Sequence, residues 1–83
     1  MKLHIMEQKV IKFVKDYLKE RYPDIIDENL IIFVVWSCYI LRNRKFLVGC
    51  NVNNLYFEVT YNANKEEWYL DVYKKEENII IND

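Results

Sequence analysis

Apolar residues near the start of the chain recur at helical spacing. Between His4 and Arg21 they fall three or four positions apart, and lysine and acidic residues fill most of the positions between them. This spacing is typical of an amphipathic helix with one buried stripe. Tyr22 and Pro23 end the helix, because proline disfavours helical geometry in the residue before it. The stripe consists of Met6, Val10, Phe13, Val14, Tyr17 and Leu18.

The chain after this helix has the pattern of β-strands. Segments rich in β-branched and aromatic residues alternate with short connections containing asparagine, which tolerates the positive φ of tight turns. Connections this short force neighbouring strands to run antiparallel. We therefore predict an α+β fold, in which the N-terminal helix packs on a four-stranded antiparallel β-meander. The predicted strands are about 30–42, 45–51, 55–62 and 66–73, with turns at Asn43-Arg44, Val52-Asn53-Asn54 and Asn64-Lys65.

All 83 residues are expected to form a single domain, because a chain of this length buries only about 60–65% of its unfolded surface. The end of the chain is ambiguous. Lys74-Lys75-Glu76-Glu77 favours a helical turn, whereas Ile79–Ile81 favours a strand or a docking segment. We expect a short C-terminal helix or an irregular tail. The parts of the domain are a helix at about 4–21, a sheet at about 30–73 and a tail at 74–83.

Alternation in the last two strands determines how they face one another. Apolar residues are odd-numbered in 55–62 and even-numbered in 66–73. For both apolar sets to face the helix, each odd-numbered residue of the first strand must pair with an even-numbered residue of the second. A turn at Asn64-Lys65 then places Glu58 directly opposite Asp71. Like charges in this position cost a few tenths of a kcal/mol to about 1 kcal/mol. Another interaction should therefore offset their repulsion.

The outward face of these two strands is the candidate site, because tyrosines surround the two carboxylates there. Such a group suits a cationic or polyhydroxyl ligand, or an Arg or Lys anchor of a partner protein; a metal ion is the weaker alternative. In the structural interpretation, water or a basic side chain of the first hairpin (Arg42, Arg44 or Lys45) neutralises the pair. The candidate binding residues are Tyr56, Glu58, Thr60, Tyr69, Asp71 and Tyr73.

The first strand is apolar on both of its sides. Between Ile31 and Leu41, both the even-numbered and the odd-numbered positions are almost all apolar. One helix covers only one face of a sheet, so the second face needs another cover, and a second copy of the chain is the simplest one. We therefore predict a homodimer. The alternative is that Ile79–Ile81 folds back over that face.

Composition argues against several classes of function. A single glycine rules out the phosphate-binding loops of nucleotide-binding proteins. The single histidine, His4, is expected at the start of the helix and cannot supply a catalytic triad or a multi-histidine metal site. Cys38 and Cys50, with eleven residues between them, match no zinc or redox spacing and are expected to be reduced and packed. We expect no enzyme, no cofactor and no metal.

The sequence also predicts where the protein acts. The apolar run of about a dozen residues is shorter than the roughly 20 that a membrane-spanning helix needs. Residues 1–5 lack the long apolar region of a signal peptide. We therefore expect a cytoplasmic protein with no membrane partner.

Nucleic acid is an alternative partner that the sequence does not favour. With 12 Lys and Arg against 13 Asp and Glu, the net charge of -1 supports neither a DNA mimic nor a binder of duplex DNA. A lysine stripe on the helix could still contact the phosphates of a single strand while the sheet tyrosines stack on its bases. Ordinary solvated helix faces have the same pattern. The stripe consists of Lys9, Lys12, Lys15 and Lys19.

Short ordered strings in the second half of the chain resemble a family. They are Val34-Val35-Trp36, Leu41-x-Asn43-x-Lys45-x-Leu47, Tyr56-Phe57-Glu58-Val59-Thr60-Tyr61-Asn62 and Tyr69-Leu70-Asp71-Val72-Tyr73-Lys74-Lys75 with Glu77-Asn78. These strings are similar to those of a small domain-of-unknown-function family encoded by phages and prophages of Gram-positive bacteria. The match covers roughly residues 34–78, and the N-terminal helix agrees in character.

The resemblance implies a phage accessory setting and no established activity. We expect a non-enzymatic protein that binds and modulates a host or anti-phage defence component in the host cytoplasm, for example as an anti-CRISPR or another anti-defence inhibitor. Two alternatives remain: a single-stranded nucleic-acid binder, and a small-ligand binder or minimal enzyme that uses Glu58 and Asp71.

Overall fold

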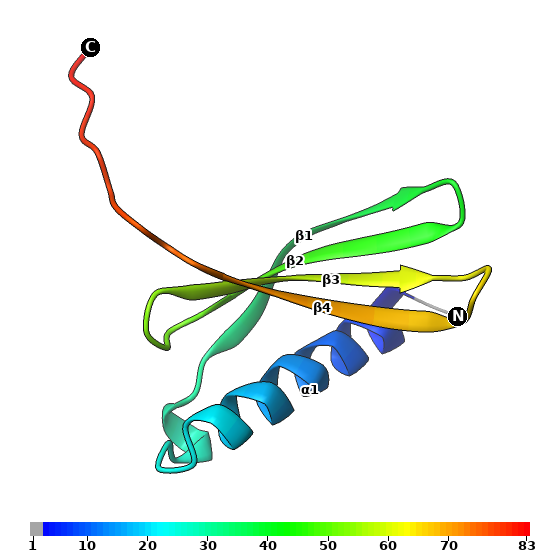
Figure 1. Cartoon of the computed structure of the whole chain (residues 1–83), viewed down its shortest axis with the longest axis horizontal. Helices are drawn as coiled ribbons and strands as arrows, with labels where there is room; N and C mark the ends of the chain where they lie inside the picture. The colour runs from blue at the N-terminus through cyan, green and yellow to red at the C-terminus, as the bar shows by residue number, and fades with distance from the viewer. Residues whose placement is uncertain (1–2) are drawn as a thin grey trace.

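The computed structural model describes residues 3–83, and it shows one helix packed against one face of a four-stranded sheet (Figure 1). The strands are antiparallel to their neighbours and follow the order β1-β2-β3-β4, so the sheet is a meander. The predicted α+β fold is confirmed. The elements are α1 (Leu3–Arg21), the 3-10 turn η1 (Asp27–Asn29), β1 (Ile32–Ile40), β2 (Asn43–Cys50), β3 (Leu55–Asn62) and β4 (Glu67–Lys74).

The core lies between α1 and the inner face of the sheet. Val10, Val14 and Leu18 of the predicted stripe are fully buried, and each such side chain contributes on the order of 1.5–3 kcal/mol to stability. His4 lies within α1, but its side chain is outside the described part of the structure. No helix in residues 3–83 is both long enough and apolar enough to cross a membrane. The sheet side of the core consists of Phe46, Val48, Leu55, Phe57 and Val59.

The first hairpin turns at Leu41 and Arg42, two residues earlier than predicted. Ile40 pairs with Asn43, so the predicted turn residues Asn43 and Arg44 belong to β2. Leu41 has φ 51, and the Arg42 N–H donates a hydrogen bond across it to the Ile40 carbonyl at 3.1 Å. A hydrogen bond that spans one residue of positive φ is typical of the rarer, strained form of γ-turn. The prediction was wrong because it assigned the turn to asparagine, whereas a leucine adopts the strained conformation.

The second hairpin turns where the sequence predicted. Asn53 and Asn54 have φ 51 and 58, in the left-handed region that asparagine tolerates better than most residues. The Leu55 N–H donates a hydrogen bond to the Val52 carbonyl at 3.0 Å, which closes the turn.

The third hairpin keeps the predicted register but has a longer turn than Asn64-Lys65 alone. Residues 63–66 form the turn, and the positive φ falls on Glu66. Asn62 Oδ1 accepts hydrogen bonds from the N–H groups of Asn64 and Lys65 at 3.1 and 3.2 Å. A side chain that binds the backbone two residues ahead stabilises a turn without glycine. The longer turn adds one residue to each side, so the pairing of β3 with β4 is unchanged.

A β-bulge at Val35 interrupts the pairing of β1 with β2. Val34 pairs with Val48 and Trp36 pairs with Leu47, which leaves Val35 without a partner in the ladder. The extra residue reverses the alternation of side chains beyond it. The prediction that all even-numbered residues of this strand share one face was therefore wrong. Ile32 and Val34 face α1, whereas Trp36, Cys38 and Ile40 face away from it.

Residues 75–83 have no regular secondary structure and extend away from the sheet beyond the end of β4 (Figure 1). The Lys75 N–H donates a hydrogen bond to the Asn54 carbonyl at 2.8 Å, and Ile79, Ile80 and Ile81 are 69%, 80% and 87% exposed. Of the two forms expected for the tail, the structure has the irregular one. The alternative in which the tail folds back over its own sheet is not observed.

Candidate functional site

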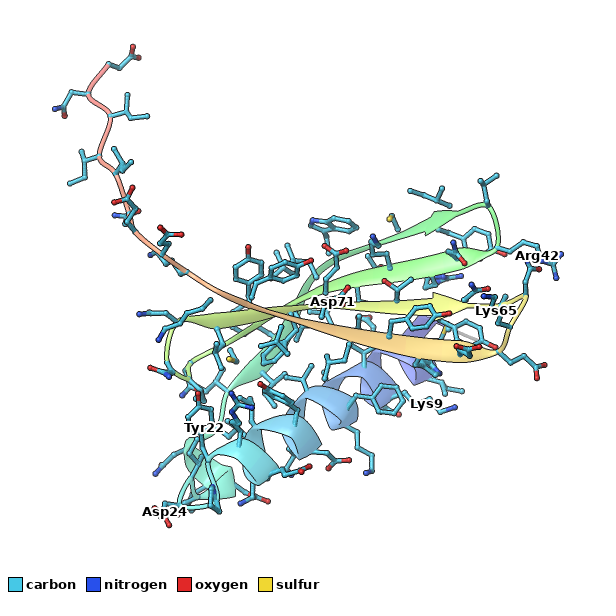
Figure 2. All side chains as sticks on the ribbon, viewed as in Figure 1. Lys9, Tyr22, Asp24, Arg42, Lys65 and Asp71 are labelled. Carbon is cyan, nitrogen blue, oxygen red and sulfur yellow. The ribbon has the colours of Figure 1, made fainter. Side chains whose placement is uncertain are left out.

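The candidate residues lie on the face of the sheet that points away from α1, which we call the outer face. Figure 2 shows Asp71 on this side of the sheet and Lys9 on the helix side. Phe57 and Val59 alternate with the candidate residues of β3 and are fully buried, so a register slip of one residue would exchange core and surface. The predicted pairing is therefore strongly specified, and the structure confirms it. The pairs are Tyr56 with Tyr73, Glu58 with Asp71, and Thr60 with Tyr69.

Tyr56 and Tyr73 form an exposed aromatic pair at one end of this face. Their ring centroids are 5.2 Å apart with an interplanar angle of 16°, and the residues are 41% and 40% exposed. Stacked rings of this kind contribute about 0.5–1.5 kcal/mol beyond their buried area. The pair is therefore a rigid apolar platform that remains open to a partner.

The ring of Phe33 continues this platform across the sheet. Phe33 pairs with Gly49, Gly49 pairs with Tyr56, and Tyr56 pairs with Tyr73, so the four residues form one row. A Cβ atom at Gly49 would lie 2.7 Å from Cε2 and Cζ of Phe33, which is closer than atoms can pack. The only glycine of the chain thus makes room for the Phe33 ring.

Glu58, in the middle of the outer face, is held by Lys45 of β2. Lys45 Nζ lies 2.8 Å from Glu58 Oε1. The hydrogen bond to Glu58, followed by the charge of Glu58, raises the pKa of Lys45 above its ordinary value. Lys45 belongs to the first hairpin, and it offsets the repulsion between Glu58 and Asp71 as the structural interpretation anticipated. Glu58 is therefore a paired carboxylate.

Asp71 differs from Glu58 because it has no such partner. Within the described part of the chain, the Asp71 side chain makes no ion pair and accepts no hydrogen bond. The charge of Glu58, then burial, then the charge of Asp71 raise the pKa of the neighbouring Tyr73 above its ordinary value. Tyr73 therefore keeps its proton at neutral pH and can donate a hydrogen bond. A free carboxylate beside a neutral aromatic ring suits a cationic group of a partner.

The other end of the candidate set is organised differently from the predicted ring of tyrosines. The Tyr69 hydroxyl donates a hydrogen bond to Glu67 Oε2 at 3.2 Å. Thr60 pairs with Lys45 of β2 on its other side. Tyr69 and Thr60 share the outer face with Asp71, but the Tyr69 hydroxyl is directed to Glu67.

Sequence reasoning missed three apolar residues of this face. Phe33, Trp36 and Leu47 also point outward, and Phe33 and Trp36 are 49% and 48% exposed. The signal for Phe33 was the isolated glycine at position 49, since glycine within a strand often marks close approach of another group. Trp36 was not predictable, because only the bulge at Val35 places it on the outer face. The site is therefore larger and more apolar than predicted.

The lysine stripe of α1 is largely neutralised by acidic residues. Lys12 Nζ lies 2.8 Å from Asp16 Oδ2, and Lys15 and Lys19 both contact Asp27, at 3.3 and 2.6 Å. Lys9 of the stripe lies on the helix side of the sheet, whereas Asp71 lies on the other side (Figure 2).

The possible metal-binding and reactive side chains of the described chain include its carboxylates and its two cysteines. In the described part of the chain, no group of three His, Cys, Asp or Glu side chains is placed to hold a metal ion. Glu58 and Asp71 are two carboxylates, and one of them is already engaged by Lys45. Cys38 and Cys50 are free thiols, and both are partly buried.

Comparison with known proteins identifies one family. Residues 4–83 match the model of the family of unknown function DUF6275. This match includes α1 and the tail, so it is longer than the 34–78 region on which the resemblance was based. No curated protein and no solved structure matches the chain.

Proposed function

The chain belongs to the DUF6275 family, and we propose that it is a small, non-enzymatic phage or prophage accessory protein. In this proposal it binds a host protein or a component of anti-phage defence, and it modulates that component in the host cytoplasm. The phage setting rests on the sequence strings described above. The observation that carries the proposed binding is the uncovered aromatic outer face around Tyr56 and Tyr73.

The aromatic composition of the outer face favours a macromolecular partner. Phe33, Trp36, Tyr56 and Tyr73 are 40–49% exposed on a face that no element of the described chain covers. Contiguous exposed apolar patches on soluble proteins mark interaction sites. Aromatic side chains also dominate the centres of protein interfaces, because they bury a large area at little cost in conformational entropy.

Asp71 gives the proposed partner a chemical character. A guanidinium or ammonium group that contacts Asp71 would make a charge-assisted hydrogen bond with the free carboxylate. The same group would lie close to Tyr73, and arginine packs well on aromatic rings. The proposed partner therefore presents an arginine or lysine among apolar residues.

The ion pair at Glu58 favours binding over catalysis. Acid-base work by a carboxylate pair depends on two groups whose pKa values are pushed apart, which requires both to be available to substrate. Lys45 Nζ lies 2.8 Å from Glu58 Oε1, so one carboxylate of the pair is already engaged. A role as a recognition face needs only the free carboxylate and the rings.

Affinity capture with matched variants tests the proposal. The tagged chain and its Asp71→Lys and Tyr73→Ala variants are expressed in phage-infected host cells, and co-purifying proteins are quantified by mass spectrometry. Tyr39→Ala is the control, because Tyr39 is an exposed tyrosine that lies off the outer face. We expect one protein to be retained by the control and depleted at least tenfold by both outer-face variants.

Two other results would contradict the proposal. Nucleic acid that co-purifies and is lost at high salt would support the single-strand alternative. A protein partner that binds all variants equally would place the binding site away from the outer face.

A further inference from the structure

The free edge of β1, on the side that does not pair with β2, has the features of a site for strand addition. β1 is an edge strand that pairs only with β2. No charged residue occurs between Ile31 and Leu41. Exposed edge strands of soluble proteins normally carry charges or are covered, because their free N–H and C=O groups pair readily with another chain. An uncharged edge of this kind is therefore expected to pair with another strand.

Apolar residues lie on both sides of this edge where β1 begins, and on the inner side the Lys15–Asp27 ion pair lies beside them. Phe33, on the outer face, is 49% exposed, and the bulged residue Val35 is 53% exposed. On the inner face, a groove of about 210 Å³ opens between α1 and β1. A strand added here would bury apolar side chains on both of its faces. The groove is lined by Ile11, Lys15, Asp27, Leu30 and Ile32.

The C-terminal tail has the complementary pattern. Ile79, Ile80 and Ile81 are consecutive, so an extended backbone would direct them alternately to its two faces. A strand that is apolar on both faces requires cover on both. These side chains are 69–87% exposed, so their own chain does not provide that cover.

The position and length of the tail point to a second copy of the chain. Phe33 and Tyr73 lie in the same row of the sheet, so the tail leaves the sheet at the end where β1 begins. It then extends away from its own sheet (Figure 1). Residues 75–83 span roughly 30 Å when extended at about 3.3 Å per residue, which equals the length of the nine-residue β1.

We propose that two copies exchange their tails, with Ile79–Ile81 of each copy added as a strand to the edge of the other copy's β1. If these ends of two molecules face one another across a two-fold axis, each tail begins beside the β1 of the other copy. The three isoleucines then pair with Ile32–Val34, the three residues that precede the bulge at Val35. This is recognition by β-strand addition. It does not depend on what the outer face binds.

Sedimentation of the full-length chain tests the exchange. We expect the wild-type chain to be a dimer, and Ile80→Asp to weaken dimerisation at least 100-fold while the far-UV circular dichroism is unchanged. Glu77→Gln is the matched control in the same segment, and it should dimerise as the wild type does. A monomeric wild-type chain at high micromolar concentration would overturn the proposal, as would an Ile80→Asp variant that dimerises normally.

Disulfide trapping tests the position of the tail. In a Cys38→Ser, Cys50→Ser background, one chain carries Phe33→Cys and another carries Ile80→Cys, because the middle isoleucine lies opposite Phe33 in the proposed pairing. Mixing and oxidation should give mainly disulfide-linked pairs of the two different chains. If the pairs form at random, or if a single chain with both cysteines closes within itself while remaining monomeric, the exchange is wrong.

Discussion

The ring of Phe33 lies over Gly49, so closely that a Cβ atom at the glycine would be 2.7 Å from two ring carbons. This contact joins β1 to β2 on the outer face and extends the aromatic row that ends at Tyr56 and Tyr73. It gives the single glycine of the chain a specific structural role.

Replacing this glycine should have opposite effects in two backgrounds. Gly49→Ala in the wild-type chain displaces the Phe33 ring and should cost about 1 kcal/mol of unfolding free energy, at the low end for overpacking because the ring can swing outward. In a Phe33→Ala background the same change should stabilise by about 0.5 kcal/mol, because alanine suits a strand better than glycine. Urea unfolding of the four chains measures both values. Equal effects in the two backgrounds would show that the ring does not rest on Gly49.

Leu41 is predicted to be a site of stored backbone strain. Its φ of 51 is unfavourable for a residue with a Cβ atom. Leu41→Gly should therefore raise the unfolding free energy by about 0.5–1 kcal/mol, even after the greater freedom of glycine in the unfolded chain is subtracted. Thermal unfolding measures the change. Leu41→Ala is the control, because it removes the exposed side chain but keeps the Cβ atom; an equal gain from alanine would rule out strain as the cause.

The two opposed carboxylates should respond differently to neutralisation. Asp71→Asn removes the repulsion with Glu58 and breaks no ion pair, so it should stabilise the fold by a few tenths of a kcal/mol. Glu58→Gln removes the same repulsion but also removes the ion pair with Lys45, so its gain should be smaller or absent. Urea unfolding at low ionic strength compares the two. Equal stabilisation by both would mean that Lys45 contributes nothing at this position.

Asp27 should make stability depend on pH in the acid range. The hydrogen bonds from Lys19 and then Lys15, followed by their charges, lower its pKa below the ordinary 3.8. A carboxyl group with a lowered folded-state pKa stabilises the fold above its unfolded-state pKa, and this contribution is lost as pH falls through the folded-state pKa.

The difference in stability between the wild type and Asp27→Asn should therefore be constant near neutral pH and should disappear as pH falls below 3.8. Unfolding titrations across this range measure it, and high salt should reduce it because the groups are exposed. Asp24→Asn is the control, since Asp24 makes no ion pair in residues 3–83. A difference that persists in acid would contradict the ion pairs with Lys15 and Lys19.

The parts of the fold that could be predicted from sequence are those governed by periodic burial. Val10, Val14 and Leu18 recur at helical spacing, and they are fully buried. The alternation of apolar and polar residues around Glu58 and Asp71 predicted that these two residues pair, because one face of β3 and β4 had to be apolar. The length of the third turn did not alter this register.

The parts that could not be predicted depend on single residues that break the pattern. Nothing in the apolar run distinguishes Val35 as the bulged residue, so the outward position of Trp36 could not be predicted. Leu41 adopts a turn conformation that its residue type disfavours. Both features lie on β1 or at its end. Apolar residues occupy both sides of this strand, so its sequence lacks the alternation of apolar and polar residues from which the facing of side chains is predicted.

A binding titration between the purified chain and its captured partner tests the central claim most directly, namely that the outer face is the recognition surface. Tyr73→Ala and Tyr39→Ala make the same chemical change on and off this face. We predict that Tyr73→Ala raises Kd at least tenfold and that Tyr39→Ala changes it less than twofold. Equal Kd values for the two variants, with both chains folded, would contradict the claim.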